Sequence, residues 1–593
     1  MFLRCTGRFK DGKEHRYWNI VENKLTAGGR VVQRQVLYLG EINDSQQETW
    51  RKTIEVFEYG QTLPRQMVIF PEDRPLPKGA CNAVQVKLNE IEIKKPRQWG
   101  ACWLFCELWD QLQLDRFWQN RLLQGRKGTR WLNVLKTLTA YRLIDPGSEW
   151  RLHRLWYEQS AMGDLLGEDF GLVQKDKLYR CLDKLLEHKK ALFSFLKGRW
   201  QDMFNVQFDI LLYDLTSTYF ECDPPDEGKR RFGYSRDKRS DCVQVVIALI
   251  VTPDGFPLAY EVMSGNTKDS NTLEGFLEKI EEQYGRANRT WVMDRGIPTE
   301  ATIEKMKNST PPVSYLVGTP KGRLNELEKR FLNLSWEGAR ENVNVKLLAE
   351  EGEMYILVES ANRLNKERSM RRRKLKKLWN RLKQLQRQRN SRDQLLLKIG
   401  AAKKDAGRAY SLVEINLPDI EEPAGDKHFT FSFSLRKDKL RSVRKREGRY
   451  LIRSNMTITD PALLWKQYML LTEIEQAFKE LKGELSIRPI NHQKDERIEA
   501  HIFVAFQAYC LNVTLKHRLK ALATGLTQRS VIEKFKTIQM VDVHLPTTDG
   551  RHLKLSRYTQ PEKDHKILLA RLSLDLPPQP PPKITSKGAV VDQ

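Results

Sequence analysis

The stretch Phe208-Asp-Ile-Leu-Leu-Tyr-Asp214 decides the fold: it is an apolar run that ends on a carboxylate. Branched and aromatic side chains in a run of this length predict a buried strand. Two more apolar runs follow at 243–251 and 256–262, and Pro253-Asp-Gly255 between them is a strong hairpin signal. The three runs therefore predict three successive strands, of which the last two form a hairpin.

The next segment adds a helix and a further strand to this sheet. Ser270 to Gln283 reads as an amphipathic helix, and Thr290 to Met293 reads as a short buried strand that precedes Asp294. This order predicts an α/β fold in which an antiparallel meander leads into a parallel strand. Active sites of open sheets of this type gather beyond the strand ends. Because Asp214 and Asp294 both follow apolar runs, we expect them at the same edge of the sheet.

A third acidic residue, Glu475, lies in the helical segment Tyr468 to Lys482. Two aspartates and a glutamate could form an acidic pocket for two divalent ions, the arrangement that phosphodiester chemistry uses. Magnesium prefers oxygen ligands, so Asp214 would bridge the ions while Asp294 and Glu475 would each complete one shell. Without metal the three charges repel one another, and we expect a raised pKa for at least one of them.

The chain as a whole is strongly basic, with 101 Lys+Arg against 76 Asp+Glu and a formal net charge of +25. Such an excess attracts polyanions, with nucleic acid as the first candidate and an acidic membrane surface as the second. No apolar stretch reaches the roughly 20 residues that a membrane span needs. The N-terminus lacks a signal-peptide core. We therefore expect a soluble intracellular protein that binds nucleic acid and no membrane.

The part of the chain before Phe208 divides into a β portion and a helical portion. Residues 15–42 predict a β-hairpin and 46–59 a helix, whereas 98–200 is helical throughout. A proline-rich linker and a short alternating strand lie between them, marked by Pro64, Pro71, Pro75, Pro77, Val84, Val86 and Leu88. The helical portion carries the basic residues Arg126, Lys127, Arg130, Arg142, Arg151 and Arg154. These residues could bind duplex DNA, or they could form an ordinary solvated helical surface.

A long segment separates Asp294 from Glu475. Residues 310–360, 428–435 and 450–453 look strand-rich, and Arg363–Lys404 holds seventeen Lys or Arg against two Asp or Glu. A block this dense repels itself unless a polyanion neutralises it. Its leucines are spaced as the seam of a short coiled coil or of a helix hairpin, at Leu375, Leu378, Leu382 and Leu385. We predict a β-rich insertion at 310–455 with a DNA-binding helical arm that includes Arg371, Arg372 and Arg373.

Four groups of motifs, in a fixed order along the chain, carry a resemblance to a known family. They are Tyr213-Asp214-Leu-Thr-Ser-Thr-Tyr219-Phe-Glu221 with Phe232-Gly-Tyr-Ser-Arg-Asp-Lys238, Gly255-Phe-Pro-Leu-Ala-Tyr-Glu261 with Ser264-Gly-Asn-Thr267, Val292-Met-Asp294-Arg295-Gly296, and Tyr468 to Lys482 with Leu485-Ser-Ile-Arg-Pro-Ile-Asn-His492 and Arg497-Ile-Glu-Ala-His501. Together they resemble the DDE transposases of bacterial insertion sequences, in particular the IS4 group and its IS1634 family. The likeness covers the chain from about Gln98 to about residue 515.

The resemblance implies an RNase H-like core in which Asp214, Asp294 and Glu475 form the catalytic triad and bind Mg2+, for which Mn2+ can substitute. In the family, a Tyr, an Arg, the Glu and a Lys recur at fixed spacing, and the Arg and Lys contact DNA phosphates near the cut. Tyr468, Glu475 and Lys482 fit this pattern. Leu471 stands at the arginine position and departs from it.

Further DNA contacts are expected around the triad. The residues chosen are Tyr468, Lys482, Arg295, Arg488, His492, Arg497 and His501, in addition to the three arginines of the arm. Arg497 and His501 lie one helical turn apart and could hold the DNA backbone. Metal binding by the histidines is not expected, because a magnesium site prefers oxygen ligands.

These observations predict six parts of the chain. They are an N-terminal β-hairpin and strand module at 1–95, a helical DNA-binding module at 96–205, a first core part at 206–309, the insertion at 310–455, a second core part with the catalytic glutamate at 456–525, and a C-terminal segment at 526–593. The Pro-rich tail from Leu576 onward is expected to be disordered.

The predicted function is that of a DNA transposase. It would bind the terminal inverted repeats of its element, cleave strands and transfer the 3′-OH into target DNA. We expect at least a dimer when two element ends are held together, in the bacterial cytoplasm at the nucleoid. Two alternatives remain: an inactive, transposase-derived DNA-binding protein, and an RNase H-like nuclease that cuts without joining.

Overall fold

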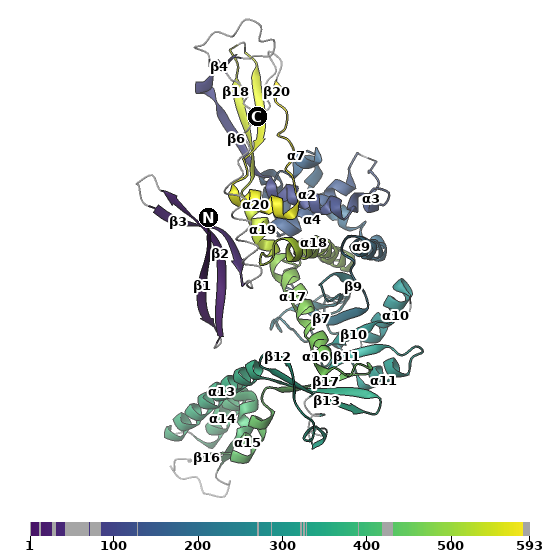
Figure 1. Cartoon of the computed structure of the whole chain (residues 1–593), viewed down its shortest axis with the longest axis vertical. Helices are drawn as coiled ribbons and strands as arrows, with labels where there is room; N and C mark the ends of the chain where they lie inside the picture. The colour runs from purple at the N-terminus through teal and green to yellow at the C-terminus, as the bar shows by residue number, and fades with distance from the viewer. Residues whose placement is uncertain are drawn as a thin grey trace.

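The computed structural model describes residues 2–10, 13–25, 31–41, 70–71, 85–126, 128–269, 272–285, 288–320, 323, 327, 329–388, 391–417, 431–548 and 550–584. The molecule is elongated, with a small sheet formed partly by β18 and β6 near one end and the helices α13, α14 and α15 at the other (Figure 1). The predicted mixed α/β class is confirmed.

A nine-stranded sheet in the order β12-β13-β14-β17-β11-β10-β7-β8-β9 forms the centre of the molecule. Five of its strands come from the region around the two aspartates: β7 (Ile210–Phe220), β8 (Val243–Val251), β9 (Pro257–Ser264), β10 (Thr290–Met293) and β11 (Ser314–Thr319). β7, β8 and β9 form an antiparallel meander, and β10 and β11 run parallel to β7. The predicted meander and parallel strand are therefore both present.

Two predictions for this sheet need correction. β7 does not end at Asp214: it continues to Phe220, because Leu215 to Phe220 pair with β8 along their whole length. β11 was assigned to the insertion, yet it pairs in parallel with β10. The first core part therefore extends beyond residue 309.

The helices between these strands use their apolar faces to cover the sheet region. α10 (Leu273–Tyr284) buries Leu273, Phe276 and Ile280, and α11 (Glu300–Asn308) begins at an N-cap in which the Thr299 hydroxyl accepts a hydrogen bond from the Thr302 amide. After the insertion, α16 (Pro461–Met469) and α17 (Leu471–Lys479) return to the sheet, and a π-helical turn, η7 (Glu480–Glu484), follows them. α17 packs on β7 and β8, the strands nearest the first aspartate.

The insertion extends the central sheet instead of forming a separate β domain. Its strands β12 (Glu337–Arg340), β13 (Val343–Glu350), β14 (Glu353–Ser360) and β17 (Arg449–Ser454) join the sheet through β17, which lies between β14 and β11. The remainder projects from it as α13 (Ala361–Arg387), α14 (Arg392–Ala406), a 3-10 turn η6 (Gly407–Leu412), α15 (Lys437–Arg446) and a two-stranded ribbon of β15 (Val413–Asn416) and β16 (Ser432–Leu435).

The leucine seam of the arm forms a helix hairpin, which decides between the two arrangements that the spacing allowed. Leu378, Leu382 and Leu385 on α13 pack against Leu395 and Ile399 on α14 in a small core of their own. The arm is therefore a compact unit at one end of the molecule (Figure 1).

The helical module is built around a helix from the far end of the chain. Its own elements are α2 (Gly100–Gln111), α3 (Leu114–Trp118), α4 (Trp131–Ile144), α5 (Glu149–Arg151), η2 (Leu152–Trp156), α6 (Tyr157–Gln159), α7 (Met162–Leu166), η3 (Phe170–Val173), α8 (Lys175–Leu182), η4 (Leu186–His188) and α9 (Lys189–Phe204). α18 (Asp495–Leu522) packs against α2, α4 and α8. α18 is long and apolar enough in composition to cross a membrane, but 94% of its most apolar window is buried inside the protein, as in a core helix.

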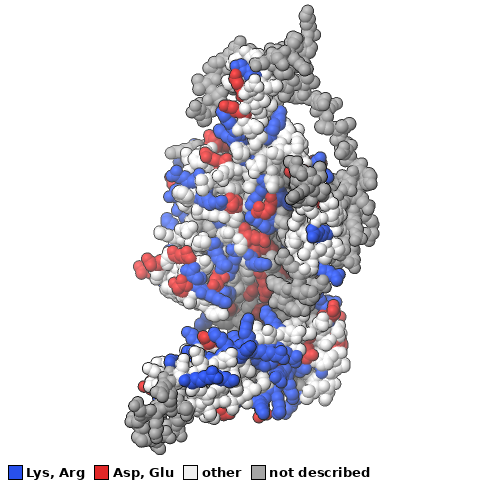
Figure 2. All heavy atoms as spheres, turned by 90° about the vertical axis from the view of Figure 1, so that its left-hand side faces the viewer, with Lys and Arg blue, Asp and Glu red and all other residues white. Residues whose placement is uncertain are grey.

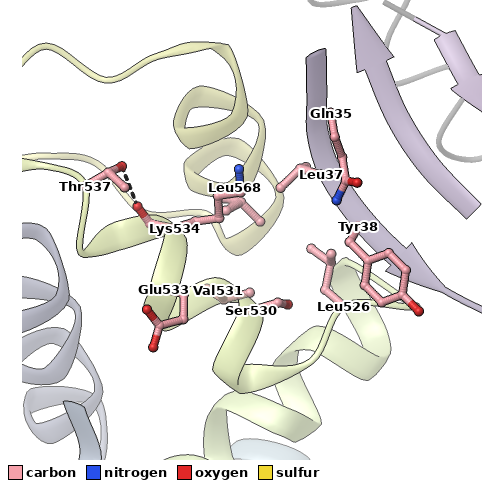
Figure 3. Close-up of a pocket in the computed structure, with 10 residues that line it drawn as sticks. All are labelled: Gln35, Leu37, Tyr38, Leu526, Ser530, Val531, Glu533, Lys534, Thr537 and Leu568. Carbon is pink, nitrogen blue, oxygen red and sulfur yellow. Dashed lines mark hydrogen bonds between the residues drawn. The ribbon is translucent and has the colours of Figure 1, made fainter. Parts of the chain in front are cut away.

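The N-terminal portion is a three-stranded antiparallel sheet of β1 (Phe2–Lys10), β2 (Lys13–Leu25) and β3 (Val31–Gly40), one strand more than the predicted hairpin. β3 lies beside α19 (Gln528–Phe535) and α20 (Lys563–Leu572), and a cavity of about 280 Å³ separates them (Figure 3). Leu37 of β3 and Leu568 of α20 both line this cavity, which places the first strands against the last helices.

A four-stranded sheet joins residues near the start of the chain to its end. It has the order β20-β19-β18-β6 and contains β6 (Glu92–Gln98), β18 (Gln539–Pro546), β19 (His552–Tyr558) and β20 (Lys583–Ile584). β6 pairs with β18 across more than 400 residues of sequence. A short ribbon of β4 (Phe70–Pro71) and β5 (Gln85–Val86) precedes it, and η1 (Leu88–Glu90) shows that the strand expected at Val84–Leu88 ends at Val86.

Residues 576–584 of the Pro-rich tail are ordered, which corrects the prediction of disorder for this part of the tail. The Tyr558 amide donates a hydrogen bond of 3.0 Å to the Gln579 side chain, whose amide group donates one of 2.9 Å to the Tyr558 carbonyl. Tyr558 in turn stacks on Trp99, with ring centroids 4.2 Å apart. Prolines lack the N–H of a sheet strand, but they pack beside an edge strand when neighbouring side chains supply the hydrogen bonds. The helix predicted at 46–59 and the residues Pro64, Pro75, Pro77 and Lys127 lie outside the described residues.

Candidate active site

The first two carboxylates lie side by side on neighbouring parallel strands. Met293 is the register partner of Tyr213 in the β7–β10 pair, so Asp294 and Asp214 follow at the same level of the sheet. Neighbouring strands are about 4.8 Å apart, which brings the two residues into the same small volume. β10 ends at Met293, whereas β7 continues. The end of β10 leaves Asp294 exposed, and Asp214 is partly buried within its strand.

Glu475 reaches the same place from α17. Ile474, Ala477 and Phe478 form the buried face of that helix, which packs on β7 and β8. The neighbouring acids are bonded to α18: Glu473 accepts from Lys516 at 2.8 Å, and Glu480 accepts from Asn512 at 3.0 Å. Glu475 is exposed. Glu473 and Glu480 therefore make packing contacts with α18, and Glu475 is the glutamate that stays exposed.

The other two acids lie within electrostatic range of Asp214. Burial raises the pKa of Asp214 to about 7, the Leu215 amide and Arg236 oppose this rise, and the charges of Asp294 and Glu475 increase it. The expected raised pKa is confirmed for one of the three carboxyls. The main cause differs from the expectation, because loss of water contributes more than mutual repulsion.

Gly318 and Tyr468 position Asp294. The Tyr468 hydroxyl donates a hydrogen bond of 3.1 Å to Asp294 Oδ1. Gly318 on β11 lies beneath this contact, since a Cβ at that position would be 2.5 Å from the Tyr468 hydroxyl and 3.3 Å from Asp294 Oδ1. Burial, and then the charge of Asp294, raise the pKa of Tyr468 and keep it protonated as the donor. Tyr468 was predicted to contact DNA; in the structure it holds a carboxylate.

Lys482 and Arg488, both predicted to contact DNA, meet at Asp237. Lys482 Nζ lies 2.9 Å from Asp237 Oδ1, and an Arg488 guanidinium nitrogen lies 2.5 Å from Oδ2. Burial lowers the pKa of Lys482, and Asp237 acts to raise it. Lys482 belongs to the π-helical turn η7, where Leu485 N–H bonds to Glu480 carbonyl. A π turn therefore follows the α-helix that carries Glu475, and it changes the helical phase at Lys482.

Three predicted DNA contacts are turned inward or are already paired with acids. His492 and His501 are 7% and 4% exposed, and both point at Glu149 Oε1, at 3.3 and 3.1 Å. Arg497 forms a bidentate pair with Asp183, at 2.7 and 2.9 Å. The prediction that the histidines hold DNA backbone is wrong, because the packing of α18 on the helical module covers them.

The Glu149 cluster is the group of described residues in which three ligand atoms lie within 4.8 Å of one another. A guanidinium shares this space: Arg142 lies 3.8 Å from Glu149 Oε1 and 3.5 Å from His501 Nδ1. A metal ion there would face a buried positive charge, which does not fit. The cluster instead satisfies the charge of Glu149, whose pKa is lowered well below its usual value because hydrogen bonds from both histidines outweigh burial. Arg142, predicted to be part of a basic surface, is buried here.

The arginines of the arm divide into two kinds. Arg371 is a half-buried anchor, since it forms a bidentate pair with Glu447 at 2.5 and 3.2 Å. Arg372 and Arg373 are exposed and line a surface hollow of about 420 Å³ on α13, together with Asn365, Arg368, Ser369 and Lys376. Figure 2 shows Lys and Arg gathered densely over this lower part of the molecule. Arg295 beside Asp294 is exposed as well. Arg295, Arg372 and Arg373 therefore remain available for phosphate.

Leu471 begins α17 and is 8% exposed, packed into the main core. Sequence reasoning missed two residues that shape the site, Asp237 and Gly318. It also missed Glu149, which lies away from the site. Asp237 lies in a motif that was quoted but given no role. Gly318 and Glu149 had no sequence signal, because their partners Tyr468 and His501 are more than 100 residues away.

No curated protein matches this chain. Among solved structures it is similar to a cryo-EM structure of the piggyBac transposase synaptic complex with hairpin DNA, at 8% sequence identity and a TM-score of 0.32, covering 73% of this chain and 76% of that one. The family described as "Transposase DDE domain" matches residues 208–511, just over half of the chain and all of the segment that carries Asp214, Asp294 and Glu475. The chain belongs to the DDE transposase domain family.

Proposed function

We propose that this protein is an insertion-sequence transposase of the IS4 group, close to the IS1634 family, that cleaves DNA at the ends of its element and transfers the 3′-OH into target DNA. One observation carries the proposal. Asp214 and Asp294 lie at one level of adjacent strands, and the charge of Glu475 on a separate helix acts on Asp214. The five strands β7 to β11 would be the RNase H-like core.

The donor set suits a hard divalent cation such as Mg2+, or Mn2+ in its place. All three side chains offer oxygen only, and burial, with a smaller contribution from the charges of Asp294 and Glu475, raises the pKa of Asp214 to about 7. Two bound ions would activate the attacking oxygen and neutralise the leaving one. A two-ion site spreads its ligands widely because the ions are about 3.5–4 Å apart.

The protein's own residues would organise the reaction around that site. Tyr468 fixes the Asp294 carboxylate, so that this ligand is ordered before DNA arrives. Arg295, Lys482 and Arg488 would hold the phosphates that flank the cut. The exposed arginines of the arm would neutralise DNA further away, and the N-terminal and helical modules would bind the terminal repeats. We propose at least a dimer on paired ends, acting at the bacterial nucleoid.

The test is a nicking assay with purified protein, Mg2+ and labelled DNA carrying the element's inverted repeats. Asp214→Asn, Asp294→Asn and Glu475→Gln should each abolish nicking and retain DNA binding. Glu473→Gln is the matched control, because Glu473 lies on the same helix but bonds Lys516 of α18. Nicking retained in all three variants would refute the triad. Nicked DNA without joined product would indicate the nuclease, and binding without nicking by the unaltered protein would indicate the inactive relative.

A further inference from the structure

Asp237 lies at the centre of a partly buried ion cluster, and Arg236, the residue before it, is within electrostatic range of Asp214. Its side chain is 12% exposed and Lys482 is 13% exposed, while Arg488 is 28% exposed. Arg488 also lies over the ring of Tyr219, 5.7 Å from its centroid, on the strand that carries Asp214. One aspartate therefore connects the end of the catalytic helix to the first catalytic strand.

The loop that carries Asp237 is fixed to the sheet on both sides. A Cβ at Gly233 would lie 2.0 Å from the Gly265 carbonyl oxygen, so the backbone there is packed as closely as glycine allows. The buried Gln244 amide donates to the Tyr234 carbonyl at 3.1 Å and to that of Gly265 at 2.9 Å. Arg236, the residue before Asp237, pairs with Asp269 at 2.5 Å. Asp237 thus has a defined position relative to Asp214.

The cluster brings cations together that would otherwise repel. Arg236 opposes the raised pKa of Asp214 and also lowers the pKa of Lys482, so it lies within electrostatic range of both. Arg236, Lys482 and Arg488 carry three positive charges, and Asp237 and Asp269 carry two negative ones. One positive charge is left over, which would favour a polyanionic substrate. Lys482 has three N–H donors and Arg488 has five, so both retain donors after binding Asp237.

We propose that Asp237 is a positioning residue for phosphoryl transfer: it holds Lys482 and Arg488 as one preorganised pair that receives a DNA phosphate at the edge of the carboxylates. The proposal rests on the proposed function for the identity of the substrate. The ion cluster itself is independent of that function. A preorganised pair acts on the reacting geometry more than on overall affinity.

The first experiment needs no catalysis. Acylation of Lys482 by an N-hydroxysuccinimide ester, measured by peptide mass spectrometry on the whole protein, reports how firmly the amine is held. Asp237→Asn should raise the acylation rate about tenfold, the scale of losing a charge-assisted hydrogen bond. Asp254→Asn is the matched control, because it removes the partner of Lys520 in an exposed pair and should leave Lys482 unchanged.

The second experiment separates DNA binding from the cleavage step. In single-turnover nicking of bound DNA, Asp237→Asn should slow the cut by about ten- to a hundredfold while DNA binds as tightly or more tightly, because an acid has been removed. Asp237→Glu should recover part of the rate, and equal melting temperatures exclude misfolding. Unchanged acylation of Lys482, or a nicking loss that only follows weaker binding, would overturn the proposal. If the unaltered protein never nicks, the proposed function fails, and the acylation ratio alone decides whether Asp237 holds Lys482.

Discussion

Asp214 and Glu149 are carboxylates shielded from water whose pKa values move in opposite directions. Burial raises the pKa of Asp214 to about 7, with Arg236 opposing the rise and two acids adding to it, whereas Glu149 has two histidines and an arginine around it and its pKa falls well below the usual range. Burial acts in the same direction on both residues. Their neighbours therefore decide the sign. A buried acid that the protein itself compensates stabilises the fold, and one left among other acids is suited to a ligand from outside.

The largest expected effect is on the free energy of unfolding, and two variants test the contrast between Asp214 and Glu149. Glu149→Gln leaves Arg142 without its buried counter-charge and should lower the free energy of unfolding by about 3–5 kcal/mol. Asp214→Asn removes a carboxylate whose charged form burial disfavours, and it should leave the stability unchanged or raise it. Urea denaturation in EDTA at neutral pH measures both. Equal losses in the two variants would mean that the clusters do not differ in kind.

The pH dependence of stability sharpens the same contrast. Folded Asp214 keeps its proton to about pH 7, whereas the unfolded chain releases it near 3.8, so this group destabilises the fold as pH rises through that window. Burial lowers the pKa of His501 to about 4 from 6.5, so this group destabilises the fold as pH falls through its window. Each effect amounts to at most about 1.4 kcal/mol per pH unit.

These two slopes oppose each other between about pH 4 and 6.5 in the unaltered protein. Asp214→Asn should therefore lose stability more steeply on acidification than the unaltered protein does. His501→Gln should instead gain stability, relative to the unaltered protein, as the pH falls through this range. Melting temperatures across this range in EDTA measure both, and parallel curves for all three proteins would contradict the assignment.

A smaller effect is expected from the support of Asp294. Gly318→Ala places a methyl group 2.5 Å from the Tyr468 hydroxyl. The displaced hydrogen bond should slow nicking about tenfold. Gly338→Ala is the control in the same sheet, since a Cβ there meets nothing within 4 Å. A Gly318→Ala variant as fast as Gly338→Ala would show that the contact with Tyr468 is dispensable.

The smallest effect separates the arginines of the arm. Arg372→Ala should reduce the salt dependence of DNA binding by about one phosphate contact, with stability unchanged. Arg371→Ala should instead lower the melting temperature, because it breaks the bidentate pair with Glu447. Fluorescence anisotropy at several salt concentrations measures the first, and thermal melts measure the second. The opposite pattern would exchange the two roles.

The sequence predicted the local elements well and the long-range contacts poorly. The strand Thr290–Met293 was predicted with the bounds that it has in the structure, because its apolar run has clear limits. β7 was cut short at Asp214 because Thr216, Ser217 and Thr218 look like a loop, although they are buried beside β8. His501 looks like a surface residue in sequence, and only the approach of Glu149 from another module explains its burial.

The same difference between local elements and long-range contacts holds for the candidate site. The family match confirms the transposase prediction, and the assignment of Asp214, Asp294 and Glu475 as its catalytic residues remains a prediction. Local motifs were enough to choose these acids. The partners that fix them, Tyr468 on Asp294 and Asp237 on Lys482, depend on tertiary contacts that no motif encodes.

The packing of α18 into the helical module has a consequence for protein synthesis. α2, α4 and α8 are translated early, but the helix that fills the space between them ends at Leu522. A ribosome must therefore complete most of the message before that module can close, and until then its apolar faces are open to chaperones or to aggregation. A stop codon before Glu475 would remove both that glutamate and α18, and the module would stay open. We expect that such shortened products could not bind the element ends through the helical module, and so could not inhibit the full-length protein by competing for those ends.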